Sequence, residues 1–195
     1  MVILSIGCEN GIYFTGNRST RPTSHTNKLN EVKKMELTYE NMVQHMDNYF
    51  ADYNLYAADN KTLPKMLKYY TRDIMLISYT LHPEKELPLE KILRAMNHPG
   101  LHEEFTPNYY VVDERRKVVV VQMINQFSEE STGRTFPPKQ LSVHYYMVLN
   151  EKQEVKFNKI LFFVEKVGPG EGDEVGKLMI QYRGEPISIE GNQEG

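Results

Sequence analysis

The sequence has no tryptophan and only one cysteine, Cys8, so no disulfide can form within one chain. Such cysteine usage is compatible with a reducing compartment, and we expect a cytoplasmic location. The sequence also lacks any run approaching the ~20 apolar residues of a membrane-spanning helix. It carries no basic surplus, because the formal net charge is −3, which argues against an obligate nucleic-acid binder. We therefore predict neither a membrane nor a nucleic acid as a partner.

The first 34 residues lack the hydrophobic pattern of a folded unit. After a short apolar start they are rich in Ser, Thr, Asn and basic residues, with few groups to bury. We expect residues 1–34 to be a mobile extension, and Met35 could be the real translational start. The apolar run before Cys8 is shorter than the ~7–15 residues that the core of a signal peptide needs, so we attribute its likeness to a lipoprotein signal to chance.

The most strongly patterned part of the chain contains two long apolar runs, each folded back by a polar turn. They are YYVVDERRKVVVVQMINQF, from residue 109, and LSVHYYMVLNEKQEVKFNKILFFV, from residue 141. Alternating β-branched and aromatic residues around charged turns predict two antiparallel hairpins. Gly133–Pro138 is the predicted loop between them, because Pro cannot occupy a central strand.

The residues before the hairpins are predicted to be mainly helical. Apolar residues recur at spacings of three and four after Thr38, which can cap a helix. Shorter helices are predicted from Thr62 and from Pro88, the second ending at residues 98–100. The stretch IMLIS, residues 74–78, is a candidate strand. Helices that cover one side of an antiparallel sheet define an α+β fold.

The chain changes again after Val167. Residues 168–176, GPGEGDEVG, are predicted to be a flexible link, and residues 177–183, KLMIQYR, to add an edge strand or pack on a neighbour. The last residues are expected to be loose. The folded domain is therefore predicted to span residues 35–167, with residues 168–195 as a link and a C-terminal appendix.

This order of elements over residues 38–166 resembles the SnoaL-like branch of the NTF2-like superfamily of cone-shaped α+β barrels. The stretches that carry the resemblance are YFADYNLYAADNKTLPKMLKYYTRDIMLIS, the third helix, and RRKVVVVQMINQF followed by GRTFPPKQLSVHYYMVLNEKQEVKF. The resemblance implies a curved antiparallel sheet packed against three N-terminal helices, with a pocket between them. In the family that pocket serves cofactor-free cyclases, dehydratases, isomerases and epoxide hydrolases, or ligand and partner binding, and the fold does not choose among these.

The resemblance also implies where site residues would lie. Steroid-isomerase-like members place a carboxylate base after the first short strand, where this chain has Ser78. On the closing strand, where an acid is expected, it has Asn158 or Ile160. These departures argue against isomerase and acid-dependent cyclase chemistry of those types.

A dehydratase-type arrangement fits the residues better. Tyr49 and Tyr53 would donate hydrogen bonds to a carbonyl, His144 would shuttle a proton and Asn158 would orient the substrate, without a cofactor. The further candidates for the substrate pocket are Ser78, His102, Tyr146 and Phe162.

Each histidine also has a purely structural interpretation. His98 can lie at a helix C-terminus, where a cation is favoured. His102 adjoins Glu103 and Glu104 and can lie in a solvated loop, and His144 can be a hydrogen-bonded core residue. No His pair has the helical spacing of metal ligands, so we expect no metal site.

Strand parity gives the closing hairpin two faces. Ser142, His144 and Tyr146 share one face, and Asn158, Ile160 and Phe162 join them if the turn keeps the register even. Leu141, Val143, Tyr145 and Met147 form the other face, joined in that register by Phe157, Leu161 and Phe163. Both faces are apolar, so one should meet the helices and the other a second copy, which predicts a homodimer through the sheet.

The orientation of these faces separates two hypotheses for function. If the His144 face is concave, the pocket is tipped with polar groups, and a cofactor-independent lyase or isomerase acting on a small hydrophobic carbonyl compound follows. If the other face is concave, the cavity is apolar, and a non-catalytic module for ligand or partner binding is favoured.

Overall fold

One long helix and a curved sheet account for most of the fold. The computed structural model describes residues 35–57, 59, 61–78, 86–164 and 171–187. The helices are α1 (Tyr39–Tyr56), the 3₁₀ helix η1 (Leu63–Tyr69), α2 (Leu89–Met96) and α3 (Glu171–Gln181). The strands are β1 (Tyr70–Ser78), β2 (Glu86–Pro88), β3 (Leu101–Asp113), β4 (Val118–Glu129), β5 (Arg134–Thr135), β6 (Lys139–Leu149) and β7 (Val155–Val164).

Helix α1 forms where the apolar spacing predicts it. Thr38 caps the helix, and its Oγ1 accepts a hydrogen bond from the Asn41 backbone N–H at 3.4 Å. The face of α1 that packs on the sheet contains Met42, Met46, Tyr49, Phe50 and Tyr53, all of them buried. The helix therefore brings tyrosines into the interior as well as apolar side chains.

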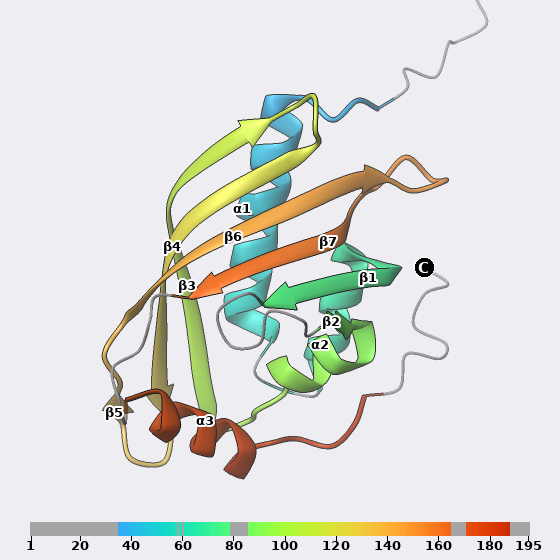
Figure 1. Cartoon of the computed structure of the whole chain (residues 1–195). Coiled ribbons are helices and arrows are strands. Elements are labelled where there is room, and N and C mark those ends of the chain that lie inside the picture. Colours follow the sequence, from blue (N-terminus) through green and yellow to red (C-terminus); the bar gives the residue numbers. More distant parts are fainter. Residues whose placement is uncertain (1–34, 58, 60, 79–85, 165–170, 188–195) are drawn as a thin grey trace, which may run out of the picture. The chain divides into compact units, whose positions relative to one another are not determined.

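The sheet has the strand order β2-β1-β7-β6-β4-β3, and β5 pairs with β4. The predicted hairpins are confirmed as β3–β4 and β6–β7. The pairing of β1 with β7 is parallel, so the sheet is mixed rather than wholly antiparallel. A parallel pair needs a long crossover, which here includes α2 and the strands from β2 to β6. The sheet bends around α1 without closing into a barrel (Figure 1), which confirms the curved sheet and helices expected for an NTF2-like fold.

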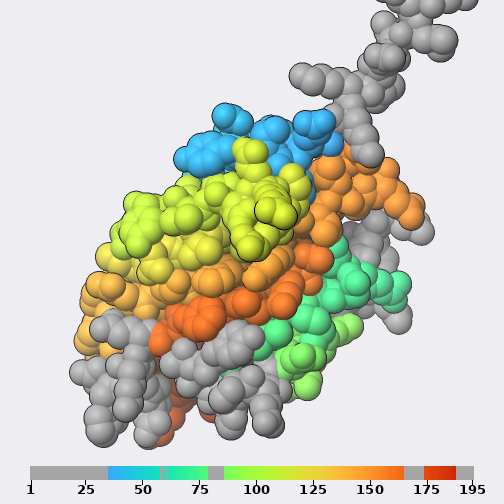
Figure 2. Space-filling view, turned by 45° about the horizontal axis from the view of Figure 1, so that its top comes forward, coloured from blue at the N-terminus to red at the C-terminus, as the bar shows by residue number. Residues whose placement is uncertain are grey.

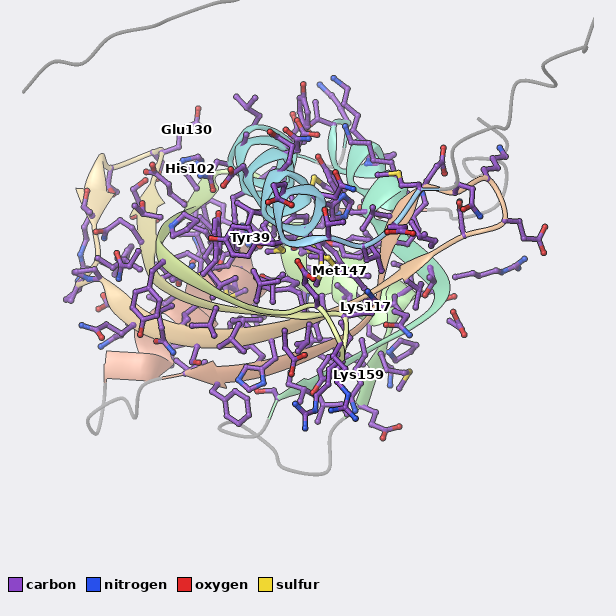
Figure 3. The ribbon with its side chains drawn as sticks, turned by 90° about the horizontal axis from the view of Figure 1, so that it is seen from above. Tyr39, His102, Lys117, Glu130, Met147 and Lys159 are labelled. Atoms are coloured by element: carbon purple, nitrogen blue, oxygen red, sulfur yellow. The ribbon has the colours of Figure 1, made fainter. Side chains whose placement is uncertain are left out.

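The concave face of the sheet is the apolar one. Leu141, Val143, Tyr145 and Met147 of β6 are buried, whereas the residues between them are half-buried. Seen from above, Met147 lies on the side of the sheet that faces α1, and Lys159 lies on the opposite side (Figure 3). The other face is seen in Figure 2 as successive bands formed by the strands from β3 to β1.

A bulge in β7 changes the parity expected for the closing hairpin. Tyr146 is opposite Lys159 but Met147 is opposite Phe157, so Asn158 is an additional residue on β7. Phe162 is consequently opposite Val143 on the concave face, and Leu161 is opposite His144 on the convex face. The even register that would group Ile160 and Phe162 with His144 is therefore not formed.

The C-terminal residues differ from the predicted edge strand. Most of the stretch KLMIQYR lies in α3, and the preceding residues 171–176 are helical as well. Val175, Leu178, Met179 and Tyr182 are half-buried, and their spacing of three and four is typical of a helix. The sequence prediction missed this helical period because it assigned residues 168–176 to a link and residues 177–183 to an edge strand.

The expectations for residues 1–34, for the start of the link and for the last residues lie outside the described part of the chain. Within the described part, no helix is both long and apolar enough to cross a membrane.

Candidate functional site

Aromatic side chains fill the concave side of the sheet. The Tyr49 ring of α1 lies 5.0 Å from Phe157 and 5.6 Å from Tyr145, measured between ring centroids. The hydroxyls of Tyr49 and Tyr70 are 3.0 Å apart. Burial raises the pKa of both phenols well above its ordinary value, so they remain protonated hydrogen-bond donors. This part of the interior is a packed core with a few phenol groups inside it.

One carboxylate faces the same interior. Glu103 lies on β3 between the buried Leu101 and Phe105, and its side chain is 12% exposed. Tyr53 donates its phenol hydrogen to Glu103 Oε2 at 2.6 Å, and Asn125 Nδ2 donates to Oε1 at 2.8 Å. Both carboxylate oxygens are therefore held by donors from other elements, α1 and β4, as a buried charge requires.

His98 lies beside this carboxylate, in the loop that follows α2. Its ring is 1% exposed, and Nε2 lies 3.6 Å from Glu103 Oε2, an ion-pair separation that is long for a hydrogen bond. Nδ1 donates to the Leu101 carbonyl at 2.7 Å, so the neutral ring keeps its lone pair on Nε2. Burial is the largest influence on the His98 pKa and lowers it, but the adjacent Glu103 carboxylate and backbone hydrogen bonds together raise it by more, so the net pKa is above the ordinary value.

Glu103, His98, Tyr53 and Asn125 are called the Glu103 cluster below. It combines a carboxylate that can accept a proton, an imidazole that can carry one and a phenol that can donate a hydrogen bond. Nε2 of His98 is buried and has no hydrogen-bond partner among the described residues. Those residues also contain no group of three or more His, Cys, Asp or Glu side chains that could hold a metal ion. The side chains of the Glu103 cluster are suited to proton transfer.

The four residues predicted to be catalytic do not come together. Tyr49 and Tyr53 lie on the concave side, but His144 lies on the convex face, between Val120 and Leu161 in the neighbouring strands. The His144 ring packs 5.2 Å from the Phe163 ring, and burial lowers its pKa. Successive side chains of a β-strand point to opposite faces of the sheet, so the concave and convex side chains of β6 cannot meet in one site. Through Glu103, the structure links Tyr53 to His98 instead of His144.

The remaining candidates are dispersed over the sheet. Asn158 is the bulged residue of β7, and its Oδ1 is buried without a hydrogen-bond partner among the described residues. Ser78 is buried at the end of β1, next to Phe162, which packs against the core. Tyr146 lies on the convex face with Lys159 Nζ 5.2 Å from its ring, and His102 is exposed on β3.

The sequence-based argument missed Glu103 and Asn125. The sequence prediction placed His102 in a solvated loop because Glu103 and Glu104 adjoin it, but β3 already begins at Leu101, so Glu103 lies on a strand. The alternation of Leu101, Glu103 and Phe105 was the available signal, because residues two apart on a strand share a face. Asn125 likewise shares the inner face of β4 with Met123, which is buried.

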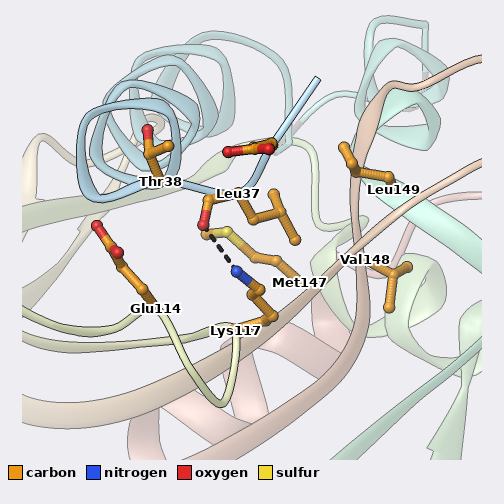
Figure 4. A pocket seen from close by; sticks show the side chains of 8 residues that line it. Leu37, Thr38, Glu114, Lys117, Met147, Val148 and Leu149 are labelled. Carbon is orange, nitrogen blue, oxygen red and sulfur yellow. Dashed lines mark hydrogen bonds between the residues drawn. The ribbon is translucent and has the colours of Figure 1, made fainter. Parts of the chain in front are cut away.

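A separate open pocket of about 480 Å³ lies at the beginning of α1. It is lined by Glu36, Leu37, Thr38, Glu114, Lys117, Met147, Val148 and Leu149 (Figure 4). Lys117 Nζ donates to the Leu37 carbonyl at 3.0 Å, the bond drawn as a dashed line in Figure 4. None of the candidate catalytic residues lines this pocket, so it is distinct from the Glu103 cluster.

Solved structures share the fold at low sequence identity. PrhC from Penicillium brasilianum has a TM-score of 0.52 and 9% identity over 73% of this chain and 89% of its own. The BvnE pinacolase from Penicillium brevicompactum has a TM-score of 0.51 and 12% identity, covering 73% and 93%. ActVI-ORFA from Streptomyces coelicolor has a TM-score of 0.50 and 8% identity, covering 66% and 98%. No protein-family model matches the chain, and no curated protein matches it in sequence.

These likenesses define the class of protein by its fold. The curved, unclosed sheet with α1 packed on its concave side is the α+β arrangement of NTF2-like proteins. More particularly, the chain has the fold of the SnoaL-like proteins within that superfamily, as the order of its elements predicted. At identities of 8–12% the likeness concerns the fold and leaves the chemistry to the site residues.

Proposed function

We propose that the protein is a cofactor-independent acid–base enzyme, a lyase or isomerase of the SnoaL-like kind acting on a small, largely apolar carbonyl compound. The observation that carries this proposal is Glu103, a carboxylate inside an apolar cone with an imidazole at 3.6 Å and a phenol at 2.6 Å. A pinacolase has the same fold, which supports an enzyme activity on this scaffold.

The groups of the Glu103 cluster have complementary roles in such a reaction. The Glu103 carboxylate takes a proton from the carbon next to the substrate carbonyl, and the electron pair of that C–H bond moves toward the carbonyl oxygen. The Tyr53 phenol would turn its single hydrogen from Glu103 Oε2 to that oxygen when substrate binds, and burial raises its pKa well above the ordinary value. Protonated His98 supplies the proton that the product or the leaving group requires, and Asn125 keeps the carboxylate in place.

The packing of the interior favours a second candidate, a non-catalytic binding module. Tyr49, Phe50, Tyr145 and Phe157 contact one another with ring centroids 5.0–6.0 Å apart, so the concave side is mostly filled with aromatic side chains. In this case the Glu103 cluster would be a buried polar network with a structural role, and the protein would bind an apolar ligand or a partner without changing it.

The two candidates are separated by the exchange of substrate protons with solvent. Small cyclic and aryl ketones would be incubated with the protein in D₂O, and deuterium entering the carbon next to the carbonyl would be followed by NMR. The proposal predicts that the wild type accelerates exchange and that Glu103→Gln reduces the enzymatic rate by 100-fold or more, about the size expected for loss of a general base.

The chain offers a matched control for this substitution. Glu104→Gln removes a neighbouring carboxylate from the exposed face of the same strand and should leave the exchange rate unchanged. His144→Ala should also leave it unchanged, because His144 is on the convex face. Equal rates for the wild type and Glu103→Gln would contradict the enzyme proposal and favour the binding module.

The convex face is proposed to bind a second copy of the chain, which would be the homodimer expected from the sequence. Tyr109 and Val111 of β3 are 57% and 55% exposed there, unusually high for large apolar side chains. Val111 pairs with Val120, Val120 with His144 and His144 with Leu161, so these residues form a row across four strands of the convex face. This mostly apolar row supports the proposed interface.

A further inference from the structure

The C-terminal residues that follow α3 pack against the loop that contains His98. The Gly184 backbone N–H donates to the Asn97 carbonyl at 3.0 Å, and Asn97 Nδ2 donates to the Glu185 carbonyl at 2.6 Å. Asn97 is 2% exposed, so the contact is buried rather than superficial. Residues 182–187 are called the C-terminal clamp below. The lower part of Figure 1 shows that α3, which leads into the clamp, lies at the end of the sheet where β3 begins.

The fit between the clamp and the loop is close enough to exclude even a methyl group. A Cβ placed on Gly184 would lie 2.6 Å from Asn97 Cγ, and the Asn97 side chain is buried and hydrogen-bonded to the Glu185 carbonyl. A Cβ on Gly100, whose φ is +93°, would lie 2.9 Å from the Tyr182 ring. These glycines on both sides of the contact permit the clamp to reach the loop.

Tyr182 fixes the clamp to the neighbouring strand. Its hydroxyl donates to Glu129 Oε1 at 2.7 Å and lies 3.0 Å from Ser131 Oγ. Arg134 of β5 and Glu174 of α3 form a bidentate ion pair, with one hydrogen bond to each carboxylate oxygen. The clamp is thus attached at its start, through Tyr182, and at its contact with Asn97.

His98 depends on that loop for its position. Asn97 precedes it in the chain, and the only hydrogen bond described for the ring is the one from Nδ1 to Leu101. The Phe127 ring, 6.2 Å away, packs beside the imidazole without fixing its direction toward Glu103. The backbone at residue 97, together with the hydrogen bonds between His98 and Leu101, therefore helps to set how far Nε2 lies from the carboxylate, and the clamp holds that backbone.

We infer that the C-terminal clamp is part of the candidate site, and that Gly184 and Tyr182 are positioning residues that hold His98 against Glu103. The inference rests on the proposed function only for its effect on turnover, because the contacts themselves do not involve a substrate. A misplacement of about 1 Å at a reacting group can lower a rate by up to 100-fold. The clamp would accordingly make the C-terminal residues necessary for the proton transfer at His98.

The test uses the full chain with Gly184→Ala and measures the pKa of His98 by NMR titration of its ring, assigned through the signal missing from His98→Gln. The carboxylate beside His98 is that of Glu103, and Glu129 on β4 is held by Tyr182 and Thr132. We expect the raised pKa to move back toward the ordinary value in Gly184→Ala, since the ring leaves the carboxylate. Gly176→Ala is the matched control, because a Cβ there meets nothing within 4 Å.

Tyr182→Phe provides a second variant should Gly184→Ala fail to fold, because it removes only the hydroxyl bonds to Glu129 and Ser131. It should shift the His98 pKa in the same direction by a smaller amount. An unchanged His98 pKa in a folded clamp variant would overturn the inference.

The measurement also separates this inference from the proposed function. If the His98 pKa moves but no ketone exchanges its protons in the wild type, the clamp positions His98 and the proposed reaction is wrong. If exchange depends on Glu103 but the clamp variants keep both the His98 pKa and the rate, the function stands and the clamp inference fails.

Discussion

Replacing His45 with phenylalanine should make the protein less sensitive to mild acid. His45 lies on α1, with its ring edges against Tyr69 and Phe157 at centroid distances of 5.3 and 4.9 Å. Its Nε2 is buried without a hydrogen-bond partner among the described residues. Burial, followed by the charges of Lys156 and Lys68, lowers the pKa of His45 from 6.5 to about 4.

Stability depends on pH here because His45 has a lower pKa in the folded chain than in the unfolded chain. Above pH 6.5 His45 is neutral in both, and its full contribution to stability is present. As the pH falls from 6.5 to about 4, the unfolded chain binds a proton that the folded chain does not, so the free energy of unfolding decreases. Each pKa unit is worth about 1.4 kcal/mol, and the lowering corresponds to roughly 3 kcal/mol. Because domains are typically stable by only about 5–15 kcal/mol, this loss is large.

Urea unfolding of the wild type and of His45→Phe at several pH values between 4 and 7.5 measures this contribution. The wild type should lose roughly 3 kcal/mol more than the variant over this range, because phenylalanine keeps the ring packing but cannot bind a proton. NMR titration of the His45 ring gives the folded pKa independently. Parallel pH profiles for the two proteins, or a His45 pKa near 6.5, would refute the reasoning.

Two further predictions concern the two faces of the sheet. Phe157→Ala should lower the free energy of unfolding by about 3–5 kcal/mol in chemical denaturation, because Phe157 is fully buried between Tyr49 and Tyr145; a loss below about 1 kcal/mol would show that this core is loosely packed. If the convex face joins two copies, light scattering should give twice the 22.8 kDa chain mass for the wild type and a single chain mass for Val111→Lys. A monomeric wild type would disprove the proposed dimer.

Local patterns in the sequence were sufficient to predict most of the elements. The apolar spacing after Thr38 specified α1, and the alternating runs from residues 109 and 141 specified both long hairpins. These predictions succeeded because helix and strand periods are properties of neighbouring residues. The prediction failed at α3, where the helical period crossed the boundary drawn between a link and a strand.

The candidate site was predicted less completely than the fold. Tyr53 was identified from the stripe of α1, but its partners were not, because Glu103 and Asn125 are brought to it by strands far away in the chain. His144 was a reasonable candidate from composition alone, since its strand neighbours on both sides are apolar. Only the structure shows that those neighbours face the helices and that His144 does not.

The sequence by itself determined most of the helices and strands before residue 165 and the order in which they follow, and with this the resemblance to the SnoaL-like fold. Tertiary structure decided which face of the sheet is concave, because a strand with a period of two has two faces that its own residues do not orient. The bulge at Asn158 reversed which residues of β7 face the helices. The bend of the sheet around α1 placed the Glu103 carboxylate, which has polar neighbours on both sides in the sequence, inside the protein.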